Sequence, residues 1–586
     1  MSLSPSLNQW QPKRTLAEVD KIMSAPGMPH EMETAVVDGR VMRVYKHLSS
    51  SMRDFWLSCV DKYWDQTYIV FEDERLTYAE VHDRATATAA LFRDIYAINK
   101  GDRVGICSKN CPQYLIAFWA CHLLGAVTVL ANAWLPAEPL KGCLVNTQCK
   151  LILFDTERAD KLTSEMDDLR QRAGVTGVLV FNGRDQRSQY QFLESVTKQW
   201  LLEPSSVHKK AAVLKEHLVL LPEDNATIVF TSGTTGQPKG VLSTNRQFLT
   251  NSLNLLVAAT RASLRRGEDG PAAAAGPQRG VLVAVPFFHV TGSTSFSMLA
   301  TMNGSKIILM PKWDPESGDV PAMVSDLVRS SLVGFPLEGL LFGGSPSPDS
   351  LAERARAAFP SAVASQAYGM TETNSIAVSI SGEDYLARPD STGRACPVND
   401  ILIMNDENKA VGPGEVGEVW LRGPNVMQGY WGDPAATAKV VSADGWLRTG
   451  DLGVLDEEGF LYIKDRIKDV IIRGGENIDS VTVENALYSD ARVLEAAAVA
   501  VPDDRLGELV AAVVHVSPEF RGQVTEDSLI ALASTRLPKF AVPVMIELVD
   551  KPFELTPSGK IIKTELRKLA RLAWKDRNAG GLKAKL

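Results

Sequence analysis

The chain has 586 residues, of which 45% are hydrophobic and 23% charged, and its formal net charge is −8. This composition is ordinary for a globular protein that buries a core, and the negative charge excludes the basic footprint of a nucleic-acid-binding surface. Seven cysteines without any C-x-x-C spacing argue against a disulfide framework.

The first 65 residues predict an irregular N-terminal extension with an amphipathic helix around residues 46–63. Its opening stretch, MSLSPSLNQWQPKR, has no apolar core and does not fit a signal peptide. Helix-like and strand-like patterns then alternate, which predicts parallel α/β sheets covered by helices. The expected helices are 79–96 and 112–124, and the expected strands are 103–107, 126–130 and 151–154.

The longest apolar run, residues 115–131, has a length near that of a membrane span. It contains His122, Gly125 and Thr128, and its composition changes at Gly125 from helix-like to β-branched. We therefore expect a buried helix followed by a strand, and no membrane span. Cys121 and His122 have no second pair at ligand spacing, so we interpret them as part of that helix rather than as a metal site.

A loop suited to phosphate follows the strand-like run 226–230. Residues 231–240 read TSGTTGQPKG, in which glycines let the backbone approach a polyphosphate and a lysine supplies positive charge. The loop is not a Walker A motif, because proline precedes Lys239 and glycine follows it. The candidate phosphate-binding residues are Thr231, Ser232, Gly233, Thr234, Thr235, Gly236 and Lys239.

Residues 261–280 are low in bulky side chains, which predicts a loop after a helix that ends near Thr260. Short β runs and turns dominate residues 391–462. Residues 412–417 fit G-x-G-x-x-G, but they lead into a strand rather than a helix, so we reject a dinucleotide site there. A smaller α/β unit is expected from about Asp465, with strands 497–501 and 511–516 and a helix 562–573.

Seven further motifs follow the phosphate loop in order. They are PFFH (286–289) with Gly292, GGSP (343–346), YGMTET (368–373), GWLRTGDL (445–452), DRIKDV (465–470), RGGEN (473–477) and PSGK (557–560). With the loop, they closely resemble the adenylate-forming superfamily of acyl-CoA synthetases, peptide-synthetase adenylation domains and beetle luciferases. The resemblance extends over residues 67–567, which is nearly the whole chain.

This resemblance implies an α/β fold: a large N-terminal domain of two α/β subdomains plus a β-rich subdomain, and a small, mobile C-terminal α+β domain. The boundaries we expect are 1–65 for the extension, 66–464 for the AMP-binding and acyl-substrate domain, 465–578 for the small lid domain and 579–586 for a flexible tail. The resemblance also implies ATP, Mg²⁺ and CoA as cofactor and co-substrates.

The resemblance assigns the phosphate loop to the β- and γ-phosphates of ATP. Tyr368 then offers a ring face to the adenine, Gly369 lies beside it, and Gly344 belongs to the neighbouring wall. Thr371 is a phosphate donor, and Glu372 supplies a carboxylate to Mg²⁺, a cation that prefers oxygen ligands.

Two further residues are assigned to the nucleotide. Asp451 accepts hydrogen bonds from the ribose hydroxyls, a common use of a lone carboxylate at nucleosides. Arg466 supplies a fixed positive charge near the ribose and phosphate.

By the same resemblance, Lys560 bridges the substrate carboxylate and the α-phosphate during adenylation, and Lys468 is the hinge of the small domain. Rotation about that hinge then brings a tunnel for the pantetheine arm of CoA to the adenylate. His289 belongs to the acyl site. The tunnel residues are Arg473, Gly474 and Gly475.

The chain departs from the superfamily pattern between His289 and Tyr368, which are only 79 positions apart. The usual strand and turn before the GGSP motif is not found there. Besides acyl-CoA synthesis, two alternatives therefore stay open: an acyl-AMP-forming enzyme that uses another acceptor, and a noncatalytic relative that binds a nucleotide or acyl group.

The last residues, Ala584-Lys585-Leu586, are close to the SKL peroxisomal address. With Trp134 to Pro136 and the phenylalanines beside His289, they make the chain similar to fungal peroxisomal fatty-acyl and side-chain acyl-CoA ligases. We therefore expect a fatty or other apolar acid as substrate, a peroxisomal import receptor as partner and a peroxisomal location, with a cytoplasmic location as the alternative.

Overall fold

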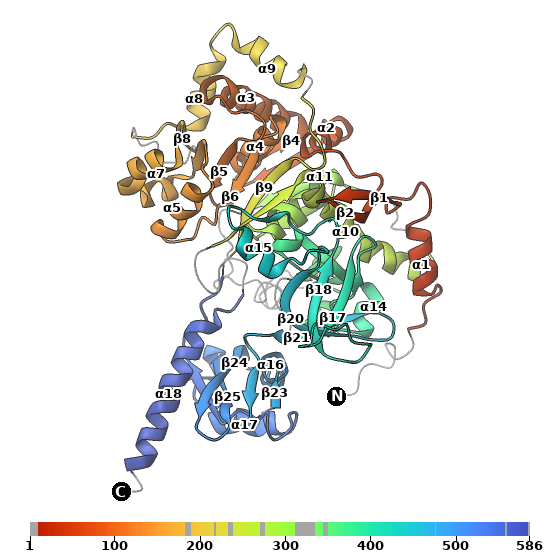
Figure 1. Cartoon of the computed structure of the whole chain (residues 1–586), viewed down its shortest axis with the longest axis vertical. Coiled ribbons are helices and arrows are strands. Elements are labelled where there is room, and N and C mark those ends of the chain that lie inside the picture. Colours follow the sequence, from red (N-terminus) through yellow and green to blue (C-terminus); the bar gives the residue numbers. More distant parts are fainter. Residues whose placement is uncertain are drawn as a thin grey trace.

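The computed structural model describes residues 10–181, 189–215, 218–231, 238–269, 276–310, 334–343, 350–474, 476–556 and 560–583. A larger N-terminal part contains five of the six sheets, and a smaller C-terminal unit, blue in Figure 1, contains the sixth. The two parts are connected after β21 (Leu461–Arg466). The predicted α/β fold with a large and a small domain is confirmed.

From residue 10 onward the chain forms an ordered arm, although the sequence predicted an irregular extension. A capping box between Thr15 and Glu18 starts its helix α1, because the two side chains satisfy each other's backbone N–H groups. A two-stranded antiparallel hairpin follows, and then the helix α2. The elements are α1 (Leu16–Met23), β1 (Met32–Val37), β2 (Arg40–Tyr45) and α2 (Met52–Tyr63).

A seven-stranded sheet forms the centre of the first subdomain, in the order β19-β10-β9-β6-β5-β7-β8. The strands from β9 to β8 in this order are parallel, and β10 pairs antiparallel with β9. The inner strands are mostly apolar, as in the run LILF of β7, because both faces are buried. The strands are β5 (Arg103–Cys107), β6 (Val127–Leu130), β7 (Leu151–Phe154), β8 (Gly177–Val180), β9 (Asn225–Phe230), β10 (Gly240–Thr244) and β19 (Gly429–Tyr430).

Helices surround this sheet, and the largest hydrophobic core lies beneath them. Trp56 of α2 stacks on Trp119 of α4 with ring centres 4.5 Å apart at the middle of that core. The apolar run 115–131 is divided between α4 and β6, as expected. The helices are α3 (Tyr78–Tyr96), α4 (Pro112–Leu123), α5 (Ala137–Asn146), α6 (Thr156–Lys161), α7 (Met166–Ala173), α8 (Leu193–Leu201) and α9 (Ser206–Lys215).

Two four-stranded sheets form the second subdomain, in the orders β11-β12-β3-β4 and β13-β14-β15-β16. The helix α10 packs against β15, and a π-helical turn, η3, precedes α11. The strands are β3 (Thr67–Phe71), β4 (Glu74–Thr77), β11 (Gly280–Val283), β12 (Lys306–Leu309), β13 (Gly339–Gly343), β14 (Val363–Met370), β15 (Ser375–Ser381) and β16 (Arg394–Ala395). The helices are α10 (Asn245–Arg265), η3 (Thr291–Phe296), α11 (Ser297–Met302), α13 (Ser350–Ala358), η4 (Thr371–Thr373) and α14 (Gly382–Ala387).

α10 corrects the sequence prediction for residues 261–280. The helix begins at a capping box between Thr244 and Gln247 and continues to Arg265, so residues 261–265 are helical rather than part of a loop. Arg261 and Arg265 are buried in the last turn, where carboxylates from distant parts of the chain pair with them.

An antiparallel sheet in the order β17-β18-β20-β21 forms the β-rich subdomain. Its elements are β17 (Asp400–Met404), β18 (Gly417–Arg422), α15 (Pro434–Val440), β20 (Leu447–Leu455) and β21 (Leu461–Arg466).

The C-terminal unit follows, with α18 along its side in Figure 1. Its elements are β22 (Ile471–Arg473), β23 (Glu476–Ile478), α16 (Ser480–Tyr488), β24 (Val493–Asp503), β25 (Gly507–Val516), α17 (Glu526–Ser534), β26 (Met545–Val549) and α18 (Lys563–Lys583). In the part of the chain described, no helix combines the length and the apolar character needed to cross a bilayer.

Candidate active site

One cavity of about 2860 Å³ lies between the two α/β subdomains, the β-rich subdomain and the C-terminal unit. Most of the candidate residues that the structure describes line this cavity, although they come from distant parts of the sequence. They are Thr231, Lys239, His289, Tyr368, Gly369, Thr371, Glu372, Asp451, Arg466, Lys468 and Lys560.

The two ends of the predicted phosphate loop lie side by side at the edge of β9 and β10. Thr231 N donates to the carbonyl of Lys239 at 2.9 Å, and Lys239 N donates to Thr231 Oγ1 at 3.4 Å. These bonds place the loop at the carboxyl end of a buried strand, where α/β sheets commonly bind ligands. The candidates Ser232, Gly233, Thr234, Thr235 and Gly236 lie outside the described residues.

Tyr368 and Gly369 lie on β14, where a bulge shifts the register against β15. A Cβ atom at Gly369 would lie only 1.6 Å from the carbonyl oxygen of Ser375, so no side chain fits at this position. The glycine therefore permits the close approach that brings Thr371 and Glu372 to the cavity. Gly344, assigned to the neighbouring wall, lies outside the described residues, whereas Gly343 lines the cavity.

Asp451 is buried, with both carboxylate oxygens occupied. The hydroxyl of Tyr368 donates to Oδ2 at 2.7 Å, and Arg466 Nε lies 3.3 Å from Oδ1. Burial and the neighbouring carboxylate raise the pKa of Tyr368 well above its usual value, so the phenol remains a hydrogen-bond donor. Tyr368, Asp451 and Arg466 thus form one connected group on the wall of the cavity.

Glu372 is held by a residue that the motifs did not identify. The hydroxyl of Tyr430 donates to Glu372 Oε1 at 2.7 Å, and Lys239 Nζ lies 4.8 Å from the centre of the Tyr430 ring. Tyr430 belongs to β19, which pairs with the phosphate-loop strand β10 through Val241. The sequence signal that could have identified Tyr430 is an aromatic residue after Gly429, beside the turn at Gly432. The sequence does not show, however, that this residue contacts Glu372 and Lys239.

The donor set around Glu372 fits Mg²⁺. That ion is commonly bound by one or two carboxylates together with substrate phosphates rather than by a cage of protein ligands. Within the described ranges, no group of three or more His, Cys, Asp and Glu side chains is arranged to hold a metal. Glu372 would therefore hold Mg²⁺ that is bound together with a nucleotide.

Lys560 of the C-terminal unit reaches into this cavity. Thr556 and Lys560 exchange two hydrogen bonds, of 2.7 Å from Thr556 N and 3.0 Å from Lys560 N, and these fix the backbone of the lysine beside Thr556. Burial and the charge of Arg466 lower the pKa of Lys560 to about 8, while the charges of Asp451 and Glu372 act in the opposite direction. The lysine is thus close to the groups assigned to ribose, phosphate and metal.

Lys468 is exposed at the start of the C-terminal unit and also lines the cavity. Partial loss of solvation and the charge of Arg466 lower its pKa. The predicted CoA residues Arg473 and Gly474 do not line the cavity; Arg473 Nη1 instead donates to the carbonyl of Phe540 at 2.8 Å. Gly475 lies outside the described residues. The structure therefore brings together the adenylation candidates but not the thioester candidates.

His289, assigned to the acyl site by the resemblance, also lines the cavity. Its Nδ1 accepts from Thr291 N at 3.2 Å, and burial together with the charge of Lys560 lowers its pKa to about 3, so the ring is neutral near pH 7. A Cβ atom at Gly292 would lie 2.2 Å from the carbonyl oxygen of Pro286, which explains the glycine after the PFFH motif.

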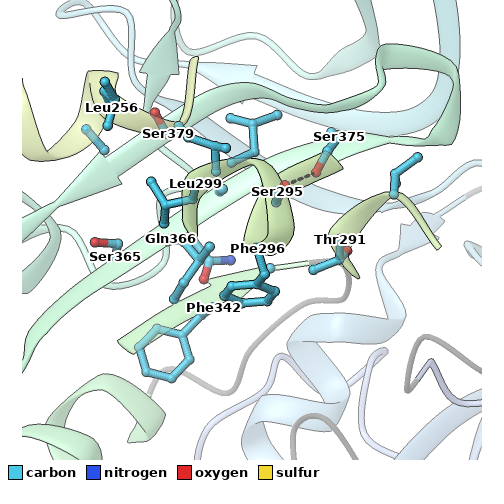
Figure 2. A pocket seen from close by; sticks show the side chains of 18 of the residues that line it. Leu256, Thr291, Ser295, Phe296, Leu299, Phe342, Ser365, Gln366, Ser375 and Ser379 are labelled. Atoms are coloured by element: carbon cyan, nitrogen blue, oxygen red, sulfur yellow. Dashed lines mark hydrogen bonds between the residues drawn. The ribbon is translucent and has the colours of Figure 1, made fainter. Parts of the chain in front are cut away.

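Apolar and polar side chains share one wall of the cavity (Figure 2). Leu256, Phe296, Leu299 and Phe342 supply the apolar surface. The hydroxyls of Ser295 and Ser375 form a 2.8 Å hydrogen bond across the cavity wall, marked in Figure 2. This wall suits an acyl group with an apolar body.

Residues 57–431 match the family model of the AMP-binding enzyme, and residues 482–560 match its C-terminal domain. The chain belongs to this family of AMP-binding enzymes. The predicted membership of the adenylate-forming superfamily is thereby confirmed. The match covers both the large part and the C-terminal unit, and it leaves out the N-terminal arm.

Among similar proteins is a feruloyl-CoA synthase of Amycolatopsis, 31% identical over 84% of this chain and 94% of that protein. Another is a long-chain-fatty-acid–CoA ligase of Mycobacterium tuberculosis, 29% identical over 84% of this chain and 93% of that protein. A similar solved structure is the o-succinylbenzoate-CoA synthetase of Bacillus subtilis with its acyl-adenylate intermediate. It has a TM-score of 0.69 and 26% identity to this AMP-binding enzyme, and the match covers 88% of this chain and 97% of that chain. The same synthetase has also been solved with ATP and magnesium.

Proposed function

We propose that this AMP-binding enzyme is an acid–thiol ligase that activates a carboxylic acid with ATP and transfers the acyl group to CoA. The observation that carries the proposal is the position of Lys560, a residue of the C-terminal unit, in one cavity with Lys239, Glu372 and Asp451. The similar feruloyl, fatty-acid and succinylbenzoate enzymes support the same reaction class.

In the first step, a carboxylate oxygen of the acid attacks the α-phosphorus of ATP. A new P–O bond forms, the bond between the α-phosphorus and its bridging oxygen breaks, and pyrophosphate leaves. The protein must hold these groups in line and offset the negative charge that gathers between them. Lys560 and Arg466 supply positive charge near that point, and Lys239 supplies it for the leaving phosphates.

The nucleotide is oriented by the remaining group of residues. Asp451 accepts hydrogen bonds from the ribose hydroxyls and is itself fixed by Tyr368 and Arg466. Glu372 would hold Mg²⁺, which would supply positive charge to the phosphates. Thr371, in the turn η4 directly after β14, donates to a phosphate oxygen.

In the second step, the thiol of CoA attacks the acyl carbonyl carbon, the bond from that carbon to the phosphate oxygen breaks, AMP leaves and the thiol proton passes to solvent. Arg473 and Gly474 lie away from the cavity in this structure, so the C-terminal unit must rotate before they can meet the pantetheine arm. Lys468, at the start of that unit, is our candidate hinge.

The substrate acid carries an apolar body, which the side chains of Leu256, Phe296, Leu299 and Phe342 would contact. This choice goes beyond the reaction class, because the similar enzymes act on aromatic, fatty and succinylated acids. The peroxisomal location and import receptor stay predictions, since Ala584, Lys585 and Leu586 lie outside the described residues.

Thioester formation from free acids tests the proposal. Purified protein, ATP, Mg²⁺ and CoA would be incubated with short, medium, long and aromatic acids, and acyl-CoA, AMP and pyrophosphate would be measured. We expect all three products in equal amounts with at least one apolar acid. Pyrophosphate without acyl-CoA would indicate another acceptor, and the absence of both with every acid would contradict the proposal.

A further inference from the structure

The N-terminal arm, residues 10–51, follows α10 along its whole length in the antiparallel direction. It lies outside the region that matches the family model, which begins at residue 57. The contacts in order along the arm are Lys13 N to the carbonyl of Arg265 (2.9 Å), Asp20 Oδ1 to Arg261 Nε (3.2 Å), His30 Nε2 to the carbonyl oxygen of Leu253 (3.1 Å) and Asp38 Oδ2 to Gln247 Nε2 (3.0 Å).

The arm also attaches α10 to the sheet that carries Tyr368 and Glu372. Asp20 bridges Arg261 of α10, at 3.2 Å, and Arg394 of β16, at 3.0 Å. Asp384 pairs with Arg265 at 2.9 Å and accepts a 2.9 Å hydrogen bond from Trp10 Nε1. The pair of Arg265 and Asp384 is buried and must remain paired, which fixes α10 against α14. The part-buried contacts of Trp10 and Asp20 attach the arm to this region.

α10 connects the reaction centre to the arm. Near its middle, Asn251 accepts a 2.9 Å hydrogen bond from Ile376 N, and Asn254 donates a 2.8 Å bond to the Ile376 carbonyl, beside Ser375. Beyond these residues, the helix lines the cavity from Leu255 to Ser263, a length of about 12 Å at 1.5 Å per residue. This section lies beyond the point where α10 contacts the turn η3 that follows His289, because Asn251 Nδ2 donates to the carbonyl of Thr294 at 3.0 Å.

A rigid turn of the arm borders the same section. Met28 and Pro29 line the cavity together with Leu255 and Ala259. Gly27, with φ +82°, allows the tight turn before Met28 and donates to Glu31 Oε2 at 2.7 Å. Lys46 Nζ lies 2.6 Å from Glu31 Oε1 and holds that carboxylate in place.

We propose that the arm forms the distal wall of the acyl cavity, with Met28 as a residue that determines which acids are accepted. The inference rests on the proposed ligase function and adds to it the class of acid: an elongated acyl group with an apolar distal end. The flexible thioether of Met28 adapts its shape to such a group. A short acid, held near His289, does not reach this wall.

Substitution of Met28 by a larger side chain tests the proposal. In Met28→Trp, the indole fills the distal section, so kcat/KM for pyrophosphate release should fall roughly tenfold or more with hexadecanoate, mainly through KM. With butanoate it should stay within about twofold of wild type. The matched control is Val36→Trp, because Val36 belongs to the same arm but is 64% exposed on β1.

Met28→Ala gives the opposite change and covers the case in which the tryptophan variant fails to fold. It enlarges the distal section and should improve kcat/KM for acids bulkier than hexadecanoate relative to butanoate. Equal changes for butanoate and hexadecanoate in both variants, or a Val36→Trp effect as large as that of Met28→Trp, would overturn the proposal.

Binding of a fluorescent long-chain fatty acid separates this inference from the ligase function. If the wild type binds the probe and Met28→Trp weakens that binding, the wall is supported even when no acid is adenylated, and only the proposed function fails. If Met28→Trp leaves probe binding unchanged, the arm does not border the acyl site and the inference is wrong.

Discussion

The hydroxyl of Tyr430 donates a 2.7 Å hydrogen bond to Oε1 of Glu372, so a short edge strand fixes the carboxylate assigned to Mg²⁺. The same strand pairs with β10, and the ring of Tyr430 lies 4.8 Å from Lys239 Nζ. Tyr430 thus connects the cationic end of the phosphate loop to the carboxylate assigned to Mg²⁺.

Tyr430→Phe should weaken the use of Mg²⁺ without loss of the fold. Partners that orient a metal-binding carboxylate typically contribute about 10- to 100-fold to affinity or activity. We expect the Mg²⁺ concentration for half-maximal pyrophosphate release to rise roughly tenfold. The control is Tyr462→Phe, which removes a comparable bond to Asp456, 3.2 Å long, outside the cavity. Equal Mg²⁺ requirements in both variants would contradict the role of Tyr430.

Asp451→Asn should weaken ATP binding. The change removes a charged acceptor and leaves Arg466 without its partner, and a lost charged hydrogen bond costs about 1.5–3 kcal/mol. Titration calorimetry with ATP should therefore show a dissociation constant roughly 10- to 150-fold higher. Asp456→Asn, outside the cavity, should leave it unchanged. An unaltered ATP affinity in Asp451→Asn would exclude the ribose assignment.

The pH dependence of adenylation should report Lys560. Its pKa of about 8 lies below the ordinary value of 10.5, because burial and Arg466 disfavour the charged form. Above pH 8 the free enzyme loses the charge, so kcat/KM for ATP should fall towards tenfold per pH unit. Lys560→Arg keeps its charge and should lack this decline, although its rate at pH 7 is lower. If kcat/KM for ATP declined above pH 8 in Lys560→Arg as well, the decline would come from the titration of another group.

As the pH rises and Lys560 loses its proton, the free energy of unfolding should increase, whereas the rate of adenylation should decrease. Between pH 8 and 10.5 the unfolded chain binds a proton at Lys560 that the folded chain does not, so this lysine makes folding more favourable as the pH rises through that window. A decline in rate above pH 8 is therefore not explained by unfolding at Lys560.

Asp384→Asn should destabilise the attachment of the arm. Arg265 and Asp384 have side chains only 6% and 8% exposed, and removal of one partner of a buried pair costs about 3–5 kcal/mol. Urea unfolding should show this loss. Glu407→Gln is the matched control, because its pair with Lys409 is 70% and 73% exposed and contributes about 0–1 kcal/mol. A similar loss in the free energy of unfolding for both variants would show that the buried pair contributes no more to stability than the exposed pair.

The motifs predicted much of the site because each is a short, continuous segment. Lys239, Tyr368, Glu372, Asp451 and Lys560 line one cavity, as the resemblance implied. Tyr430 was not identified, because its function depends on strand pairing and on a hydrogen bond to a residue 58 positions away. Such a contact leaves no local pattern in the sequence.

The fold differs from the prediction at two places, residues 261–265 and the N-terminal arm, and contacts between distant residues take part in both. Residues 261–265 (RASLR) were grouped with the residues after them, yet they continue α10, and Asp20 and Asp384 pair with Arg261 and Arg265 across more than 100 positions. The N-terminal arm has little periodicity as a whole, but a local capping box starts its helix α1 and contacts with α10 fix its course. The contacts with α10 form only in the folded chain and leave no local pattern.

The two half-reactions of Lys560→Ala test the central claim most directly. The claim is that Lys560 enters the cavity to form the acyl-adenylate and is not needed afterwards. Adenylation from acid and ATP should fall by on the order of 100-fold or more, as on loss of one preorganised charge, whereas thioester formation from supplied acyl-AMP and CoA should persist near the wild-type rate. Equal losses in both half-reactions, or none in either, would contradict the account.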